Sequence, residues 1–308
     1  MNEESLLEFK RFFVARGSLA PQNDITTRET MNTIPNTDMN DDVTFYMQGW
    51  EPEEKSKAIV CLIHGLGEHT GRYVHVGKAF NDAGYPLFGF DLRGHGQTGG
   101  RRGHFPSLDV VMQDIHQFVE FQRQNHPDQP VFLYGHSLGG LLTLSYTLQH
   151  PEGLQGVIVT GAMLRSAFDE MKVKNTLAKI LGSMAPTIAL STGLDATSIS
   201  RDPVVVEEYV NDPLVHDKGS TGLGKAILNA IDLCFAHAKE FKPPLLIMHG
   251  RDDRLTYPSG SEDFAKLAGE VNKDVTLKVW DGMYHELHNE PEQVEVFKVM
   301  IEWMDGHL

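Results

Sequence analysis

A serine lies between two glycines in the segment GHSLG at residues 135–139, which fits the pattern G-x-S-x-G. An apolar run, 131–134, precedes the segment, and a helical pattern, 141–149, follows it. A sharp strand-to-helix turn of this kind raises the serine hydroxyl above a sheet, at a helix N-terminus whose dipole favours developing negative charge. This context predicts that Ser137 is a nucleophile and not merely part of a glycine-rich turn without catalysis.

A serine hydroxyl is a weak nucleophile and needs a base that is oriented by an acid. In this kind of fold the acid and then the histidine follow the serine along the chain. Asp252 and Asp253 both follow the apolar run 245–248, and from the residues alone either carboxylate is a candidate. His285 comes directly after the last apolar run, where the base is expected, and His288 would share its face if a helical turn forms there.

The tetrahedral intermediate of acyl transfer needs two backbone N–H donors. The first is the amide of Leu138, directly after the nucleophile. The second is expected in the loop HGLGEH at residues 64–69, at the amide of Leu66. With these groups His285 would take the Ser137 proton, and the serine would attack an ester carbonyl to give an acyl-enzyme that water hydrolyses. This reaction requires no metal and no organic cofactor.

The elements that must position these groups alternate along the chain from residue 43 onward. Several of the apolar runs are continuously apolar, as in strands that are buried on both faces of a parallel sheet. The predicted strands are 43–48, 58–63, 85–90, 130–134, 156–159, 244–248 and 275–280, and the predicted helices are 108–125, 138–149, 259–269 and 291–304. This alternation predicts an α/β fold with a mostly parallel, doubly wound sheet.

Residues 164–240 interrupt the alternation, because no convincing strand occurs in this interval. Its length predicts an inserted helical subdomain that serves as a cap over the site. Apolar residues occur in it at helical spacing: Val173, Leu177, Ile180, Leu181 and Met184, followed by Ile188 and Leu190. Two interpretations of this stripe stay open. In the first it packs onto the core, and in the second part of it faces a membrane or lines an acyl tunnel. A helix is expected to bend or end before Pro186.

The remaining part is an N-terminal extension. Leu6, Phe9 and Phe13 have helical spacing and predict a short amphipathic helix, whereas residues 17–40 look irregular. The predicted organisation is an extension at 1–40, a core at 41–163 and 241–308, and a cap at 164–240.

The formal net charge of −15 over 308 residues argues against nucleic acid as a partner, and against a polybasic anchor on anionic lipid. This charge does not exclude contact with neutral lipid or micelles through an apolar patch. The N-terminus shows no secretory signal, and no run of about 18 apolar residues occurs. The expected location is therefore the cytoplasm. Of the two cysteines, Cys61 lies in an apolar run and is expected to be a buried thiol, and nothing suggests a disulfide framework or a metal site.

Several motifs together resemble the monoacylglycerol lipase family. They are HGLGEHTGRY at 64–73, DLRGHGQT at 91–98, GHSLGG at 135–140 and DGMYHELH at 281–288, with SRD at 200–202 and YVNDPL at 209–214 in the insertion. The likeness covers residues 40–305. It implies an α/β-hydrolase fold with Ser137, Asp253 and His285 as the catalytic triad and with Leu66 and Leu138 as oxyanion donors. Asp253 is selected because the family's acid stands just before Arg-Leu.

The resemblance also implies a substrate. Family members hold the glycerol end of the substrate with polar groups, and the matching positions are Glu68, Arg72, Tyr209 and His288. The expected reaction is hydrolysis of monoacylglycerols or similar single-chain esters, with a cap whose apolar rim meets lipid. A lysophospholipase or a general carboxylesterase is the alternative within enzymes. A non-catalytic ligand receptor of the same fold is the alternative of another class. The oligomeric state stays open.

Overall fold

The computed structural model describes residues 28–35, 43–52, 55–166 and 179–308, with the first of these segments described by its backbone alone. The predicted amphipathic helix around Leu6, Phe9 and Phe13 lies outside the described residues, and so do Val173 and Leu177 of the apolar stripe.

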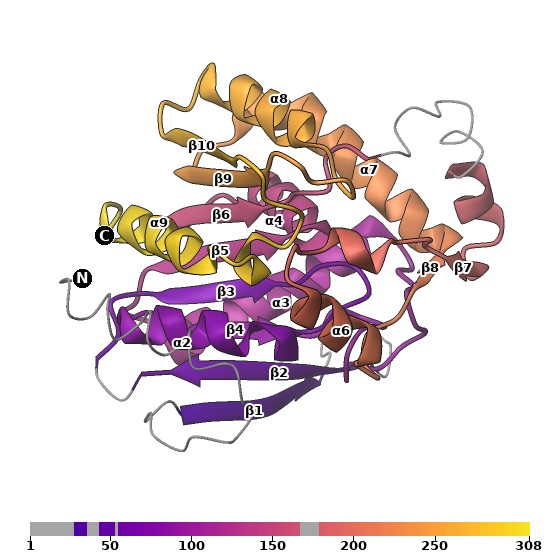
Figure 1. Cartoon of the computed structure of the whole chain (residues 1–308), viewed down its shortest axis with the longest axis horizontal. Coiled ribbons are helices and arrows are strands. Elements are labelled where there is room, and N and C mark those ends of the chain that lie inside the picture. The colour runs from indigo at the N-terminus through magenta and orange to yellow at the C-terminus, as the bar shows by residue number, and fades with distance from the viewer. Residues whose placement is uncertain (1–27, 36–42, 53–54, 167–178) are drawn as a thin grey trace.

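An eight-stranded sheet forms the centre of the molecule (Figure 1). Its spatial order is β1-β2-β4-β3-β5-β6-β9-β10. The strands are β1 (Arg28–Pro35), β2 (Thr44–Glu51), β3 (Ile59–Ile63), β4 (Leu87–Phe90), β5 (Val131–His136), β6 (Gly156–Thr160), β9 (Leu245–Gly250) and β10 (Val275–Trp280). β2 runs antiparallel to both of its neighbours, and every other neighbouring pair is parallel. The predicted mostly parallel α/β sheet is confirmed.

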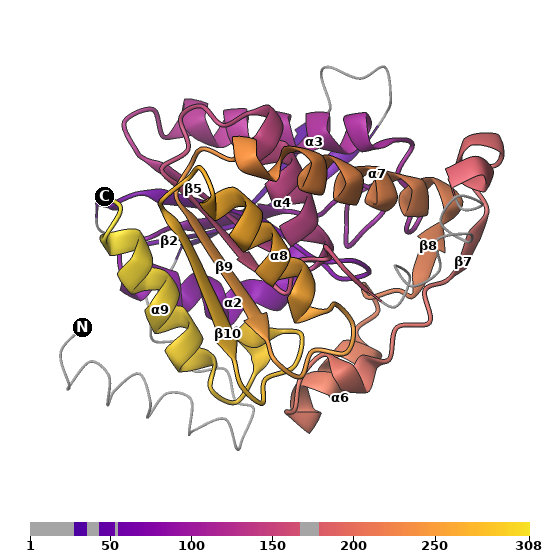
Figure 2. The same cartoon turned by 90° about the horizontal axis from the view of Figure 1, so that it is seen from above.

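Helices cover both faces of this sheet, as the view from above shows (Figure 2). Side chains alternate between the faces along a strand, so in β3 Ile59, Cys61 and Ile63 join one hydrophobic cluster and Val60 and Leu62 join the other. The first cluster packs against α3 (Leu108–Asn125), α4 (Leu138–Gln149), α7 (Thr221–His237) and α8 (Pro258–Gly269), and the second packs against α2 (Val74–Asp82) and α9 (Gln293–Asp305). Strands buried in this way on both faces explain the continuous apolar runs.

The strand order reverses direction at β3. From β3 the chain moves outward to β4, and it then returns to pair β5 on the other side of β3. In open α/β sheets, ligands bind at the carboxyl ends of the strands at such a switch point. The loops that follow β3 and β5 therefore meet there, and they contain the predicted oxyanion loop and Ser137.

The insertion between β6 and β9 contains both helices and short strands. Its described elements are a helical segment at 179–184, β7 (Ala189–Ser191), the 3-10 turn Ala196–Ser198, α6 (Pro203–Asn211), β8 (Lys218–Ser220), α7 and the 3-10 turn Ala238–Glu240. The helical segment ends before Pro186, as its missing N–H donor and fixed ring require. β7 and β8 pair antiparallel over three residues each, so the expectation of no strand in this interval was wrong. Three residues are too few to show a period of two.

The expectation that residues 17–40 are irregular was also wrong, because β1 occupies Arg28–Pro35. β1 pairs with β2 along its whole length, from Arg28 opposite Glu51 to Pro35 opposite Thr44. It is an edge strand, and hydrogen bonding to an existing neighbour decides its conformation more than its own composition does. The central sheet therefore begins before residue 41.

Candidate active site

The turn between β5 and α4 holds Ser137 in a strained backbone conformation. Its φ of 55° and ψ of −117° make it the one described non-glycine residue with a positive φ. A side chain at Gly139 would place its Cβ 2.0 Å from the carbonyl oxygen of Ile63 and 2.4 Å from that of His64. Position 139 must therefore be glycine for the start of α4 to approach the end of β3. Strain of this kind is found where a side chain has to be presented for chemistry.

Ser137, His285 and Asp253 form a continuous chain of hydrogen bonds. The Ser137 hydroxyl lies 2.8 Å from Nε2 of His285, and Nδ1 of His285 lies 2.7 Å from Oδ2 of Asp253. Because the carboxylate is an acceptor, Nδ1 carries the proton and Nε2 is free to accept one from the serine. The structure thus brings together a hydroxyl, an imidazole and a carboxylate in the arrangement that acyl transfer requires.

Asp253 is buried, and five hydrogen-bond contacts hold its carboxylate in place. Its Oδ1 accepts from the amides of Leu255 and Thr256, and its Oδ2 lies within 3.0 Å of His249, His285 and the Thr256 hydroxyl. Burial alone would raise the pKa of Asp253, but the charge of His285 and the hydrogen bonds from both histidines lower it well below its usual value. The acid therefore stays ionised, whereas Asp252 is exposed to solvent.

His285 is also buried, with 4% of its surface exposed. Burial alone would lower the pKa of its imidazole, but the negative charge and hydrogen bond of Asp253 outweigh burial and raise it, with smaller contributions from Glu286 and Glu68. An imidazolium at this position is thus stabilised, which is what a base needs after it has taken the serine proton.

The loop after β3 lies directly against the nucleophile. A Cβ at Gly65 would be 3.3 Å from Cβ of Ser137, and Gly67 adopts a φ of 77°, which turns the chain sharply at Leu66. Leu138 is the first residue of α4, where a helix N–H has no acceptor within its own helix. The structure thus places both predicted oxyanion residues, Leu66 and Leu138, beside the serine.

Three of the four predicted glycerol-binding residues cluster beside this loop. The Arg72 guanidinium donates to Glu68 at 2.8 Å, and its Cζ lies 4.7 Å from the centre of the Tyr209 ring. The hydroxyl of Tyr209 is 3.9 Å from the Cβ position of Gly67, so this insertion residue reaches the oxyanion loop.

The fourth residue, His288, lies elsewhere. It is fully buried, and its ring stacks on Tyr73 with centres 4.7 Å apart. His136 contacts both His288 and His285, with ring centres 4.7 Å and 4.8 Å away, so His288 lies behind His136 in the interior. Burial and neighbouring positive charge lower the pKa of His288 well below its usual value, which keeps this ring neutral.

The insertion is hydrogen-bonded to both loops that carry the site. On the side of the histidine, the amide of Glu286 donates to the carbonyl of Ile199 at 2.8 Å, and the Ser200 hydroxyl donates to the carbonyl of Asn289 at 2.8 Å. On the side of the oxyanion loop, the amide of His216 donates to the carbonyl of Gly67 at 2.9 Å. Nε2 of His69 also lies 2.8 Å from Oδ2 of Asp212.

Sequence reasoning missed three residues at this site: His249, Thr256 and Glu286. His249 and Thr256 support the carboxylate of Asp253, and Glu286 forms an ion pair with Arg72. One signal was present in the sequence, since each of the three is polar and lies within four residues of Asp253 or His285.

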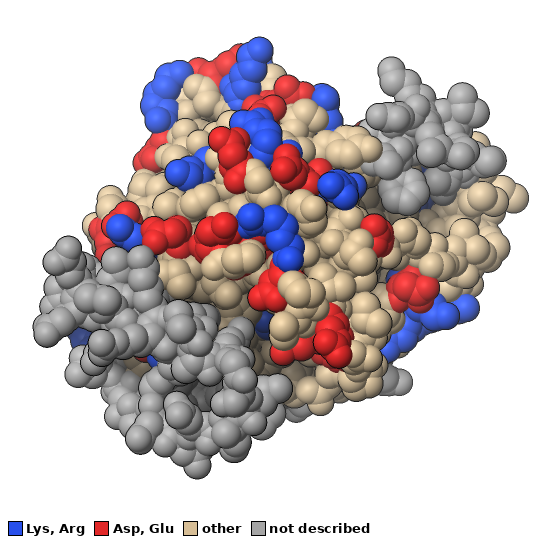
Figure 3. Space-filling model, in the orientation of Figure 1, with Lys and Arg blue, Asp and Glu red and all other residues tan. Residues whose placement is uncertain are grey.

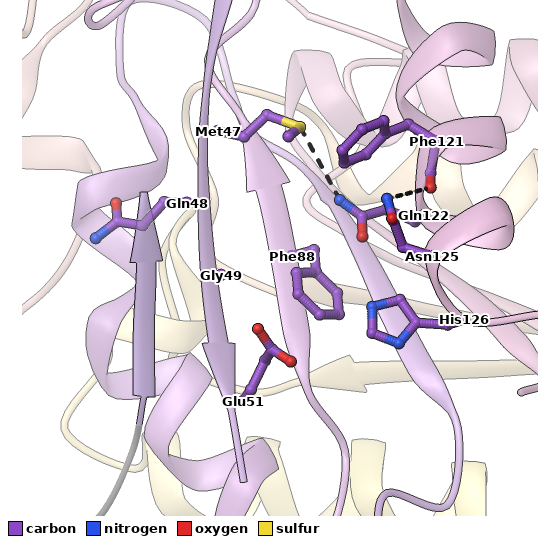
Figure 4. A pocket seen from close by; sticks show the side chains of 9 residues that line it. All are labelled: Met47, Gln48, Gly49, Glu51, Phe88, Phe121, Gln122, Asn125 and His126. Atoms are coloured by element: carbon purple, nitrogen blue, oxygen red, sulfur yellow. Dashed lines mark hydrogen bonds between the residues drawn. The ribbon is translucent and has the colours of Figure 1, made fainter. Parts of the chain in front are cut away.

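A separate cavity of about 230 Å³ lies between β2, β4 and α3 (Figure 4). It is lined by Met47, Gln48, Gly49, Glu51, Phe88, Phe121, Gln122, Asn125 and His126. In Figure 4 the rings of Phe88 and His126 lie side by side, with centres 4.9 Å apart. None of these residues belongs to the predicted site, and the lining offers no activated nucleophile.

The sheet, the strained serine turn and the order of serine, aspartate and histidine define an α/β-hydrolase of the serine type. The family described as "Serine aminopeptidase, S33" matches residues 54–292. A monoacylglycerol lipase of Mycolicibacterium smegmatis is 36% identical over 260 residues, which cover 84% of this chain and 92% of that protein. The crystal structure of Paleococcus ferrophilus monoacylglycerol lipase matches with a TM-score of 0.78 at 34% identity, over 86% of this chain and 99% of that one.

The chain therefore belongs to the monoacylglycerol lipase family of serine hydrolases, as its motifs predicted. An uncharacterized abhydrolase domain-containing protein of Dictyostelium discoideum is 40% identical over 278 residues, or 89% of this chain. The chain spans only 29% of the length of that relative. Within the described ranges, no helix is both long and apolar enough to cross a membrane.

Proposed function

We propose that the protein hydrolyses monoacylglycerols to a fatty acid and glycerol through an acyl-enzyme on Ser137. The observation that carries this proposal is the chain of hydrogen bonds from the Ser137 hydroxyl through His285 to Asp253, at 2.8 Å and 2.7 Å. The relatives named monoacylglycerol lipase support the choice of substrate.

In the proposed reaction His285 takes the proton of Ser137 as the oxygen attacks the ester carbonyl. The amides of Leu66 and Leu138 stabilise the oxyanion, and His285 then gives its proton to the leaving glycerol. Water, deprotonated by the same imidazole, cleaves the acyl-enzyme. Asp253 keeps the imidazole in the required tautomer throughout.

Arg72 and Tyr209 provide polar groups beside the oxyanion loop, where the glycerol hydroxyls would lie, and Glu68, which is buried, holds Arg72 in place. The net charge of −15 favours an uncharged headgroup over an anionic one. His288 is too deeply buried in this structure to reach a substrate directly, so we assign it a packing role beneath His136.

Rates on a panel of esters test the substrate class. We expect kcat/KM on 1-monoacylglycerols to exceed that on di- and triacylglycerols and on lysophosphatidylcholine by at least about tenfold, a difference of roughly 1.4 kcal/mol in transition-state binding. A preference for lysophosphatidylcholine would make the protein a lysophospholipase. Turnover of short-chain esters alone would make it a general carboxylesterase.

The insertion supports a second part of the proposal, which is contact with a lipid surface. The described part of its apolar stripe faces outward: Met184 is 79% exposed, Leu190 64%, and Ile180 and Ile188 49% each. The described surface over β7 is mostly uncharged (Figure 3). Exposed apolar groups that lie together mark binding surfaces. We propose that this stripe contacts the membrane or micelle that holds the substrate.

The double variant Met184→Ser/Leu190→Ser should bind neutral phosphatidylcholine vesicles at least about tenfold more weakly than the wild type, because two apolar side chains no longer leave water on binding. Co-flotation with vesicles measures this affinity. Val271→Ser is the control, because Val271 is also 64% exposed but lies just after α8, outside the insertion. Equal binding by the double variant and the control would contradict the proposal.

A further inference from the structure

Glu286 immediately follows His285 and is buried, with 3% of its surface exposed. Its two carboxylate oxygens each accept from Arg72 at 2.7 Å, in the bidentate arrangement that gives a strong and directional ion pair. Asn289 donates to the same carboxylate at 2.7 Å. The side chain next to the base is therefore fixed from two sides.

Arg72 links this ion pair to the oxyanion loop. Of its two nitrogens that donate to Glu286, Nη1 also donates to Oε2 of Glu68 at 2.8 Å. Oε1 of Glu68 in turn accepts from the amide of Gly65 at 2.6 Å and from the hydroxyl of Tyr73 at 2.8 Å. A chain of charged hydrogen bonds thus runs from the amide just before Leu66 to the residue just after His285.

The cluster contains two carboxylates and one guanidinium. Glu68 and Glu286 face one guanidinium; both carboxylates are buried, and the Arg72 side chain is 9% exposed. Burial would raise the pKa of Glu286, but Arg72 outweighs burial and holds it below its usual value. Burial and the charge of Glu286 raise the pKa of Glu68, whereas Arg72 and the hydrogen bonds from Gly65 and Tyr73 act in the opposite direction. The second carboxylate has no cation of its own, which makes the cluster costly to bury.

The position of Glu286, directly after the base, suggests its use. The charged and titratable groups that face His285 are Asp253 from the loop after β9, His136 at the end of β5, Glu286 from its own loop, and Glu68 with Arg72 from the loop after β3. His136 is neutral, because burial lowers its pKa to about 3. Apart from the acid itself, the negative charge near the imidazole therefore comes from this cluster.

We propose that Glu286 is a positioning residue of the hydrolase: through Arg72 it holds the loop of His285 against the oxyanion loop, and its charge strengthens the base. This role rests on the proposed function, because it requires His285 to accept the Ser137 proton. It assigns Arg72 to the linkage between the two loops, in addition to any contact with substrate.

The variant Glu286→Gln tests the charge, because glutamine keeps the shape and one acceptor. We expect kcat to fall by about tenfold, less than the roughly 10²- to 10⁴-fold that general-base catalysis contributes, because the base itself stays in place, while KM changes less than about twofold. A negative neighbour raises the pKa of an imidazole, so its removal must lower it. The acid limb of kcat/KM, which reports the base in the free enzyme, should therefore move to lower pH.

Two further variants separate charge from packing. Glu290→Gln is the control. Glu290 is another fully buried carboxylate of the same loop, but its partner is Arg201. This variant should leave the acid limb of kcat/KM unchanged. Glu286→Asp keeps the charge but is too short for the bidentate pair, so it should lower kcat while its acid limb stays close to that of the wild type. All rates use a monoacylglycerol below its micelle concentration, and thermal unfolding checks each variant.

The outcomes distinguish this inference from the proposed function. If wild type and Ser137→Ala have equal rates, the proposed function has failed. If the wild type is active but Glu286→Gln and Glu290→Gln show the same acid limb, the role of Glu286 is refuted. If Glu286→Gln does not fold, a wild-type kcat for Glu286→Asp would refute the positioning role by itself.

Discussion

Ser137→Ala should abolish the hydrolysis of monoacylglycerols, with a loss in kcat of about 10⁴- to 10⁶-fold, as when the nucleophile of a serine hydrolase is removed. Without the Oγ atom no acyl-enzyme can form, and His285 has no proton to accept. Release of fatty acid from a monoacylglycerol, followed over hours with the variant and over seconds with the wild type, measures the ratio. The variant should also fail to react with a fluorophosphonate probe.

The matched control is Ser145→Ala on the same helix. Ser145 is fully buried, and its hydroxyl donates to the carbonyl of Leu141 at 2.9 Å, so the change removes a buried serine without touching the site. This control should keep its probe labelling and most of its activity. If Ser137→Ala were labelled as strongly as the control, the reactive nucleophile would be another residue and the assignment of Ser137 would be wrong. If the wild type were not labelled, the protein would be a ligand receptor with a hydrolase fold.

The second large effect is expected for Asp253→Asn, which should lower kcat by about 10⁴-fold, the loss known for this change in serine proteases. An asparagine amide can face His285 with its NH₂ group, which requires Nδ1 to accept and leaves the proton on Nε2. In that tautomer the imidazole cannot take the proton of Ser137. The geometry would be preserved while the base is disabled, so kcat should fall with little change in KM.

Asp252→Asn is the control for this prediction. Its carboxylate is exposed and its backbone amide donates to the carbonyl of Met283, so the side chain has no part in the hydrogen bonds of His285. We expect wild-type kcat for this variant. Comparable losses in both variants would show that the acid has been assigned to the wrong position.

The sequence was most informative about elements buried on both faces. β3, β5 and β9 are fully buried strands, and their apolar composition leaves no other low-energy place for them. The same logic gave the helices α3, α4, α8 and α9 to within two residues of their ends. Where tertiary pairing decides the conformation, as in β1, β7 and β8, the local pattern could not predict a strand. The half-buried α2 was not predicted either.

The predicted site followed from chain order, because each side chain comes just after a predicted strand, of which β5 and β9 are buried and the edge strand β10 is not. The residues alone could not choose between Asp252 and Asp253, since neighbours on a loop point in different directions and only the fold decides which one is turned inward. The ion pair between Arg72 and Glu286 joins positions 214 residues apart. No local pattern encodes such a contact, and it emerges only when the loops after β3 and β10 meet.

The hydrogen bonds that join the insertion to the site also limit how this protein can be re-engineered. Ile199 and Ser200 hold the histidine loop, while Asp212 and His216 hold the oxyanion loop. Ile199 and His216 do so through main-chain groups, and Ser200 and Asp212 through their side chains. A chimera that received the insertion of another lipase would exchange these anchors together with the lipid-facing stripe. The insertion is therefore not an interchangeable module, and transplanted specificity would have to preserve the four anchor positions in register with the recipient loops.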